Sequence, residues 1–256
     1  MRNGWILYKK ELLETLRSYK LLWIPIVFLI LGVMQPISAY YLPEILKQAG
    51  EVPPGLLDSY TVPAAGQVMA EALGQYGTIG MLVLALGTMN VLAGERASGT
   101  AELLLVRPLS AAAIALAKWA AQLTLLAAAL LAGAAGAAYY TEALIGGLDY
   151  GAVGSAVLLY GLWLLCGLSL TLLFSAWLRG PAAACLALLT VAVLAVAHSV
   201  LPHALSWTPA SLSGLSAQAL TEGGGKIAGP VISAVLLIVL CIGGAALLVR
   251  RQHSPE

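Results

Sequence analysis

The sequence predicts an all-α integral membrane protein, a bundle of six membrane-spanning helices preceded by an amphipathic helix on the membrane surface. Composition is the first reason: 60% of the 256 residues are hydrophobic, 10% are charged, and the mean hydropathy is +0.90. A soluble domain is about 45–50% apolar and about 25% charged, so these charges are too few to cover a water-soluble surface. A disordered chain is also excluded, because it needs low hydrophobicity and high charge. The lengths of the apolar stretches and the division of the charges are the other two reasons.

The first element is a helix over residues 2–20 that lies on the inner membrane surface. Its large apolar side chains recur at steps of three or four, so on a helix they form one stripe: Trp5, Tyr8, Leu12, Leu16 and Tyr19. Lys10, Glu14 and Arg17 project elsewhere. A basic amphipathic helix with aromatic residues suits the lipid headgroup layer. The alternative is an ordinary cytoplasmic extension of the first span.

Six apolar stretches follow, each long enough to cross a bilayer as a helix of about 20 residues. Pro25 and Pro36 are expected to kink the first of them. The turn Arg179-Gly180-Pro181 separates the fourth from the fifth, which together would be too long for one span. We expect spans at about 21–41, 76–93, 119–140, 152–178, 181–201 and 230–249. Two outer loops, 42–75 and 202–229, and an inner loop, 94–118, complete a single transmembrane domain over 1–256.

The charges divide sharply between the two sides that these spans define. Six spans place both termini on one side, together with eleven of the 13 basic residues, and leave Lys47 and Lys226 on the other. Five acidic residues lie on the basic side and seven on the opposite side. Cytoplasmic loops carry the excess of Lys and Arg, so both termini are predicted to be cytoplasmic. Charges are nearly absent from the expected spans, which argues against ion-coupled carriage by carboxylates within the membrane.

The inner loop between the second and third spans reads GERASGTAELLLVRPLSAAAIALAK over 94–118. Thr100 can cap a short helix, and Glu102 lies near the positive end of its dipole. The helix ends at Arg107, because a residue before proline favours an extended conformation. Ser110 can cap the next helix, which leads into the third span.

This short helix has more apolar surface than a linker needs. Leu103, Leu104 and Leu105 follow one another, and charged residues surround them. An apolar patch with a polar rim is typical of a docking surface for another protein. The alternative is a loop helix packed against its own bundle.

The loop resembles the signature of ABC-2 type transporter permeases. The residues that carry the resemblance are Glu95, Ser98, Gly99, Thr100, Glu102, Leu103, Leu104, Leu105, Arg107, Pro108, Leu109 and Ser110, followed by Lys118. The order of elements along the whole chain is also similar to that family. Many members have a basic residue just after this serine, where the present chain has Ala111-Ala112-Ala113.

The resemblance implies the permease subunit of an ABC transporter with the architecture of a type V exporter, in the cytoplasmic membrane of a prokaryotic cell. Two copies, or one copy and a sister permease, would pair in the lipid bilayer, and nucleic acid is not an expected partner. ATP and Mg would be bound by separate cytoplasmic ATPase subunits, so the chain needs no cofactor or metal and is not an enzyme by itself. Export is the usual direction in the family.

The resemblance also implies two groups of functional residues. The short helix would be the coupling helix, seated in a groove of the ATPase, and the coupling residues would be Glu95, Arg96, Ser98, Gly99, Thr100, Glu102, Leu103, Leu104, Arg107 and Pro108. The substrate path would run between subunits, near the first, second and fifth spans. Candidate residues on it are Gln35, Thr88, Asn90, Thr190, His198 and Ser199.

Other chemical sites find less support in the sequence. The chain lacks a phosphate-binding loop, because Gly223-Gly224-Gly225-Lys226 has no glycine at the upstream spacing and is followed by Ile227. His198 and His203 are an incomplete metal site and fit a polar helix end better. An intramembrane serine hydrolase would need an oxyanion hole that nothing in the sequence indicates. A membrane scaffold that docks a soluble partner without transport is the alternative function.

Small residues recur in the third expected span. Ala129, Gly133 and Ala137 are spaced by four, a pattern that lets helix backbones approach closely within a membrane. Packing inside the chain is favoured over a seam between subunits.

Overall fold

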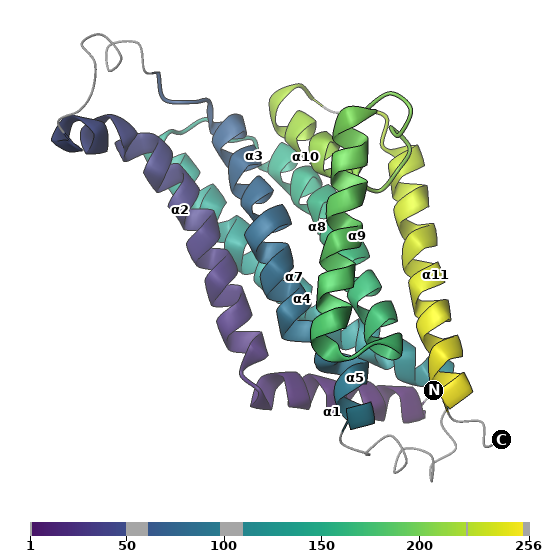
Figure 1. The fold of residues 1–256 in the computed structure, drawn as a ribbon. Coiled ribbons are helices and arrows are strands. Elements are labelled where there is room, and N and C mark those ends of the chain that lie inside the picture. Colours follow the sequence, from purple (N-terminus) through teal and green to yellow (C-terminus); the bar gives the residue numbers. More distant parts are fainter. Residues whose placement is uncertain (1, 50–60, 98–109, 224, 253–256) are drawn as a thin grey trace.

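The computed structural model describes residues 2–49, 61–97, 110–223 and 225–252. Within these ranges, six helices are long and apolar enough to cross a membrane, which confirms the predicted fold class. They run side by side, and α1 (Arg2–Arg17) lies across their lower ends (Figure 1). Both termini are at this lower end (Figure 1). The six candidate spans are Lys20–Leu46, Ala65–Ala97, Ala111–Leu144, Tyr150–Trp177, Gly180–Val200 and Ala228–Arg251.

The N-terminal helix is shorter than expected and meets the bundle with a different face. It ends at Arg17, and Tyr19 turns the chain into the first span with a φ of 58°. Leu7 is buried against the bundle, while Trp5 and Leu16 of the predicted apolar stripe stay exposed. The hydroxyl groups of Tyr8 and Thr124 share a hydrogen bond of 2.9 Å, which fixes α1 to the third span. An exposed aromatic stripe beside the ends of the spans fits a helix in the headgroup layer.

The predicted bounds of the first outer loop, 42–75, are wrong at both ends. The first span, α2 (Lys20–Ala49), continues beyond residue 41, and a helix begins again at Ala65. The second span is a series of helical pieces: α3 (Ala65–Gln75), the π-helical η1 (Tyr76–Gly80), α4 (Met81–Thr88) and α5 (Asn90–Ala97). Gln67, Glu71 and Gln75 lower the mean hydropathy of α3, so the sequence does not identify it as part of a span. The other face of α3 is nevertheless buried in the core.

The remaining spans lie close to their predicted positions. The third, α7 (Ala111–Leu144), begins earlier than 119 because Ala-rich sequence favours helix and Ser110 caps it, its Oγ accepting from the Ala113 N–H at 3.2 Å. The fourth and fifth, α8 (Tyr150–Trp177) and α9 (Gly180–Val200), are separated by the predicted turn. The sixth is α11 (Ala228–Gln252).

The second outer segment contains α10 (Ser211–Thr221), which folds back onto the upper ends of α8 and α3 (Figure 1). The Ser216 hydroxyl donates to the carbonyl oxygen of Ala156 at 2.9 Å. The outer segment 202–229 therefore contains a helix that packs against α8 and α3 of the same chain.

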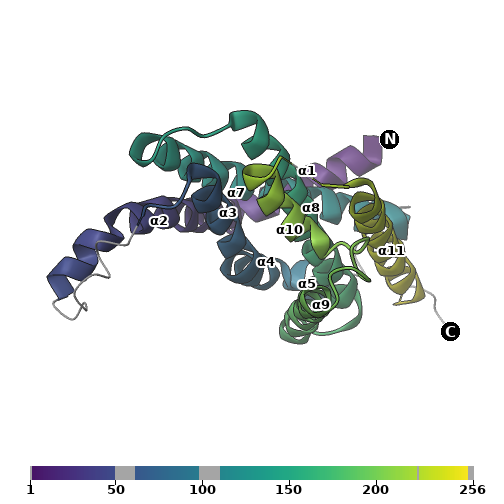
Figure 2. The same cartoon turned by 90° about the horizontal axis from the view of Figure 1, so that it is seen from above.

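Helix α8 forms the centre of the bundle and packs against α7, α9, α10 and α11. Its Leu164, Leu168 and Leu172 are fully buried. Viewed from above, α2, α4 and α9 lie along one side of the molecule and α7 lies behind α2 and α4 (Figure 2).

The small-residue face of α7 packs inside the chain, against α2. A Cβ on Gly32 would collide with the carbonyl oxygen of Gly133, and a Cβ on Gly133 would lie 2.7 Å from the carbonyl oxygen of Phe28. Ala129 and Ala137 are fully buried in the same contact. The preference for packing within the chain is therefore confirmed.

This close contact yields a stability prediction. Gly133→Ala should lower the free energy of unfolding by about 1–3 kcal/mol, because the added methyl overpacks the α2–α7 contact. The measurement is the temperature at which the detergent-solubilised protein loses its monodisperse peak. Gly154→Ala in α8 is the matched control, because a Cβ there meets nothing within 4 Å. Equal shifts for the two variants would contradict the packing argument.

Candidate functional site

The predicted coupling residues fall on both sides of the boundary of the described structure. Glu95 and Arg96 end α5, and the structure describes their contacts. The other predicted coupling residues, and with them the short helix, lie outside the described residues: Ser98, Gly99, Thr100, Glu102, Leu103, Leu104, Arg107 and Pro108. The structure therefore defines the two attachment points of this segment, the end of α5 and the capped start of α7.

Arg96 fastens the end of α5 to the end of α8. Its guanidinium donates to the carbonyl oxygens of Ser175, at 2.7 Å, and Trp177, at 3.2 Å, and also to that of Leu178. The last carbonyls of a helix have no partner within the helix and carry partial negative charge. A planar guanidinium with several N–H groups suits this cluster of acceptors.

The same junction is reinforced one turn earlier. The backbone N–H of Leu92 donates to the Ser175 hydroxyl at 3.0 Å. Asn90 lies so close to Gly180 that a Cβ on the glycine would collide with the Asn90 side-chain oxygen. The start of α5 is thus packed against the turn between α8 and α9, so a displacement of α5 is passed directly to that turn.

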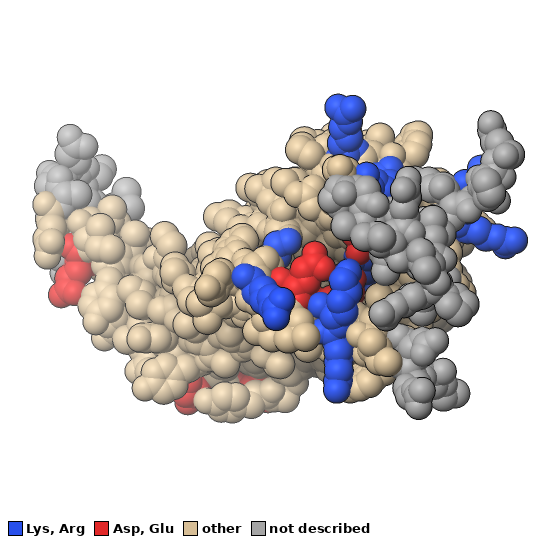
Figure 3. Space-filling view, turned by 90° about the horizontal axis from the view of Figure 1, so that it is seen from below, with Lys and Arg blue, Asp and Glu red and all other residues tan. Residues whose placement is uncertain are grey.

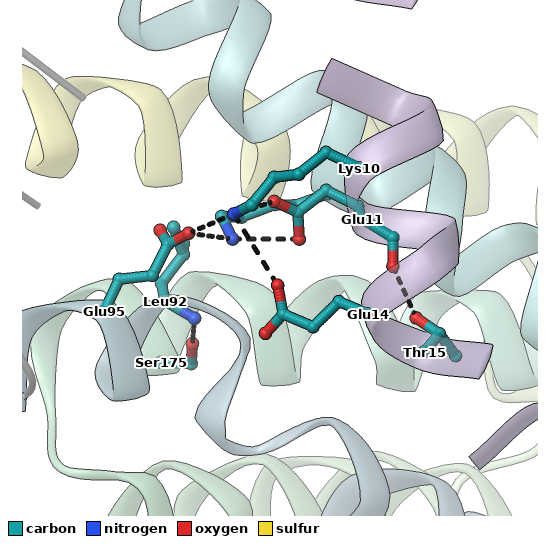
Figure 4. Close-up of polar contacts among 8 residues, drawn as sticks. Lys10, Glu11, Glu14, Thr15, Leu92, Glu95 and Ser175 are labelled. Atoms are coloured by element: carbon teal, nitrogen blue, oxygen red, sulfur yellow. Dashed lines mark hydrogen bonds and ion pairs between the residues drawn. The ribbon is translucent and has the colours of Figure 1, made fainter. Parts of the chain in front are cut away.

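Glu95 joins a buried ion-pair cluster that links three helices (Figure 4). Lys118 of α7, 2% exposed, has its Nζ 3.0 Å from Glu11 Oε2 in α1 and 2.9 Å from Glu95 Oε1 in α5. Lys10 Nζ lies 3.0 Å from Glu11 Oε1 and 3.2 Å from Glu95 Oε1. A buried charge is tolerated when it is paired and hydrogen-bonded, and this cluster meets that condition. We call Lys10, Glu11, Glu95 and Lys118 the inner charge cluster.

Lys10 of the inner charge cluster is held in its charged form. Burial by itself would lower the pKa of Lys10, but the carboxylates of Glu11 and Glu95 outweigh it and hold that pKa above its usual value. Lys10 thus remains a cation at physiological pH.

From below, acidic side chains lie at the centre of the lower face with basic side chains around them (Figure 3). They lie beside the ends of α5 and α7, where segment 98–109 is attached. A displacement of Glu95 would act on α1 through Lys10 and on α7 through Lys118.

Sequence reasoning missed this cluster and placed Lys118 at the end of a loop. Lys118 lies two turns inside α7 and is buried within a candidate span, whereas the sequence analysis placed it in the inner loop before that span. Glu11 lies one turn after Leu7 on the buried face of α1. That spacing is the local signal that could have indicated an inward carboxylate, whereas its partner is 107 positions away in the sequence.

Comparison with known proteins identifies the family of the chain. The model of the family described as "ABC-2 family transporter protein" matches residues 5–213, which include α1, five of the candidate spans and the loop between α5 and α7. The chain belongs to the ABC-2 family of transporter membrane proteins. It is similar to the uncharacterized transmembrane protein YxlG of Bacillus subtilis (strain 168), with 34% identity over 219 residues, covering 85% of this chain and 84% of the relative.

The candidate path residues of this ABC-2 protein lie at different levels of the bundle. Thr88 and Asn90 are near the inner end, and the buried Thr88 hydroxyl donates to Leu84 O at 2.7 Å. Thr190, in the middle of α9, donates to Leu186 O at 2.8 Å. At the outer end of α9, the Ser199 hydroxyl donates to Val196 O at 2.8 Å.

Two further observations concern polar side chains toward the outer end of the bundle. Gln35 of α2 binds the side chains of Glu71 and Gln75 in α3. Nδ1 of His198 is buried and makes no hydrogen bond to any described residue. Across the described ranges, no group of three His, Cys, Asp or Glu side chains could hold a metal ion.

Proposed function

We propose that this ABC-2 family protein is the permease subunit of an ATP-driven exporter, and that segment 98–109 docks on a cytoplasmic ATPase. The observation that supports the proposal best is the double attachment of this segment. At one end Arg96 and Glu95 join it to α8, α1 and α7, and at the other Ser110 starts α7. A force that reaches Glu95 and Arg96 would pass to α8, α1 and α7 through these contacts, and one that reaches Ser110 would pass to α7.

The ATPase would supply ATP binding, Mg binding and hydrolysis. Binding energy released when the ATPase subunits close would move the segment and favour one orientation of the bundle over the other. Both termini would be cytoplasmic, because they lie at the same end of the bundle (Figure 1), on the side to which the sequence assigns eleven of the 13 basic residues.

The transport path would follow the side formed by α2, α4 and α9, and would be completed by a second copy or a sister permease (Figure 2). Candidate path residues lie on α2, α4, α5 and α9: Gln35, Thr88, Asn90, Thr190, His198 and Ser199.

Purification from the native membrane tests the proposal. The tagged chain, extracted in mild detergent, should bring a stoichiometric ATPase subunit with it, and the complex should hydrolyse ATP. Recovery of another soluble partner with no effect of nucleotide would support a scaffold instead. Recovery of the folded chain without an ATPase would contradict the exporter proposal.

The contacts of Arg96 give a local prediction within the proposed coupling site. Arg96→Lys should lower the local unfolding free energy of α5 by about 1.5–3 kcal/mol, because the compact lysine ammonium cannot reproduce the contacts that two separate guanidinium nitrogens make with the three carbonyl oxygens. Amide hydrogen exchange over residues 92–97 should then be at least about tenfold faster. Arg179→Lys is the matched control, because that side chain is exposed. Unchanged exchange in the Arg96 variant would show that the three hydrogen bonds do not hold α5.

A further inference from the structure

Helix α3 carries a polar face on the outer part of the second span. Gln67, Glu71 and Gln75 are spaced by four and therefore lie on one face of the helix. The opposite face, with Val68, Met69 and Ala72, is fully buried in the core. Glu71 is exposed, and a carboxylate facing lipid tails costs several kcal/mol. This face of α3 is therefore expected to face water or protein rather than the hydrocarbon of the bilayer.

The level of this face along the bundle follows from the helical rise. Glu71 is 24 residues before Glu95 of the inner charge cluster, about 36 Å along a continuous helix at 1.5 Å per residue. The hydrocarbon of a bilayer is about 30 Å thick, so Glu71 lies at its outer edge and Gln75 about one turn deeper. Gln35, which contacts both, belongs to the same outer half of the bundle.

Two amide side chains hold the carboxylate. Gln75 Nε2 donates to Gln35 Oε1 at 2.6 Å, and Gln35 Nε2 donates to Glu71 Oε2 at 2.5 Å. These hydrogen bonds orient Glu71 but do not neutralise its charge. Within the described ranges no Lys, Arg or His forms an ion pair with Glu71, whereas Glu11 and Glu95 each pair with two lysines. Glu71 is thus a fixed anionic group without a cation of the chain beside it in the described structure.

Both helices depart from regular geometry next to these three residues. Pro36 follows Gln35 inside α2 and cannot donate a backbone hydrogen bond to the preceding turn. The π-helical segment Tyr76–Gly80 follows Gln75 directly. π-helical turns occur often at functional sites, and interrupted helices line substrate sites in membrane transporters.

The exposed surface of the second span becomes apolar on the inner side of Glu71 and its glutamine partners. Ile79, Leu82 and Leu86 continue the Glu71 face of the second span toward the inner side, and each of them is exposed, as is Met34 of α2. A ligand with its positive group on the carboxylate would place its apolar body on the nearest of these side chains, Met34 and Ile79, because Leu82 and Leu86 are 11 and 15 residues after Glu71, about 16 and 22 Å along a helix. A divalent metal ion fits less well, because it takes about six oxygen ligands and no further acidic or histidine side chain joins Glu71 within the described ranges.

We propose that Glu71, oriented by Gln35 and Gln75, binds the positive group of a lipophilic organic cation in the outer half of the transport path. The proposal rests on the proposed function, because it assumes that this side of the bundle borders a path. Glu71 acts as the counter-ion of the substrate, and the two glutamines act as positioning residues.

The test uses two ions of matched size and opposite charge, tetraphenylphosphonium and tetraphenylborate. The complex of the chain with its ATPase is placed in lipid nanodiscs, and ion binding and ATP hydrolysis are measured with each ion. The wild-type complex should bind tetraphenylphosphonium in preference to tetraphenylborate and hydrolyse ATP faster in its presence. Glu71→Gln should weaken tetraphenylphosphonium binding by at least about tenfold, the effect of losing one charge contact.

The control is Glu44→Gln, which removes an exposed carboxylate from the outer part of α2 and should leave the binding unchanged. The proposal is overturned if the wild-type complex hydrolyses ATP but does not prefer the cation, or if Glu71→Gln binds it as well as the wild type. Those results would leave the exporter function standing. A chain that recruits no ATPase yet still binds the cation through Glu71 would instead overturn the exporter function and keep the site.

Discussion

Replacing Lys118 with methionine is expected to destabilise the protein strongly, and by more than Gly133→Ala or Arg96→Lys. The substitution keeps the length and apolar stem of the side chain but removes the buried cation of the cluster and leaves Glu11 and Glu95 with the half-exposed Lys10. Removing one partner of a buried ion pair costs about 3–5 kcal/mol. We expect little folded protein in the membrane, and a much lower unfolding temperature for what is extracted in detergent.

A rescue experiment separates lost charge balance from lost packing. The triple variant Lys118→Met, Glu11→Gln and Glu95→Gln removes the buried charges on both sides and should recover much of the stability, because neutral partners tolerate burial better than an unpaired carboxylate. Lys9→Met, which removes an exposed cation beside the Trp5 ring, is the control and should shift stability by less than about 1 kcal/mol. A Lys118→Met chain as stable as the wild type would show that the inner charge cluster does not hold α1 to the bundle.

The parts of the fold that the sequence predicts well depend on local signals. Each apolar run is long enough to identify a span, and Ser110 and the turn at 179–181 mark helix ends with residues suited to those positions. The close packing of the small-residue face around Gly133 could also be predicted from the residue spacing within this one helix, since close backbone approach requires small side chains.

The parts that were missed depend on partners far apart in the sequence. Helix α3 looks like a polar loop because Gln67, Glu71 and Gln75 lower its mean hydropathy, while its buried face becomes apparent only when α7 and α10 pack on it. Lys118 could not be assigned to a buried pair from its own neighbours, since Glu11 is 107 positions away. Both errors concern polar or charged side chains. The free-energy cost of placing such a side chain in a membrane depends on the contacts that it makes in the folded protein.

The second large effect is expected in the coupling segment. The double variant Glu102→Arg and Leu104→Asp reverses one charge of the expected ATPase contact and places a carboxylate in its apolar centre. A charge buried without a partner at an interface costs several kcal/mol, so ATPase association should fall by at least about a hundredfold. Co-purification of the ATPase and its ATP hydrolysis should be lost together, while the amount of inserted permease should stay near that of the wild type.

The matched control places the same two changes at the outer end, Glu222→Arg and Leu201→Asp, where both side chains are exposed. This control should keep the ATPase, because a cytoplasmic partner does not reach the outer surface. If the Glu102→Arg, Leu104→Asp variant retained both the ATPase and transport, segment 98–109 would not be the part of the chain that couples the ATPase to transport. The Arg96 and Glu95 contacts would then serve only to fix α5 to α8, α1 and α7, and the ATPase would have to dock elsewhere on the lower face.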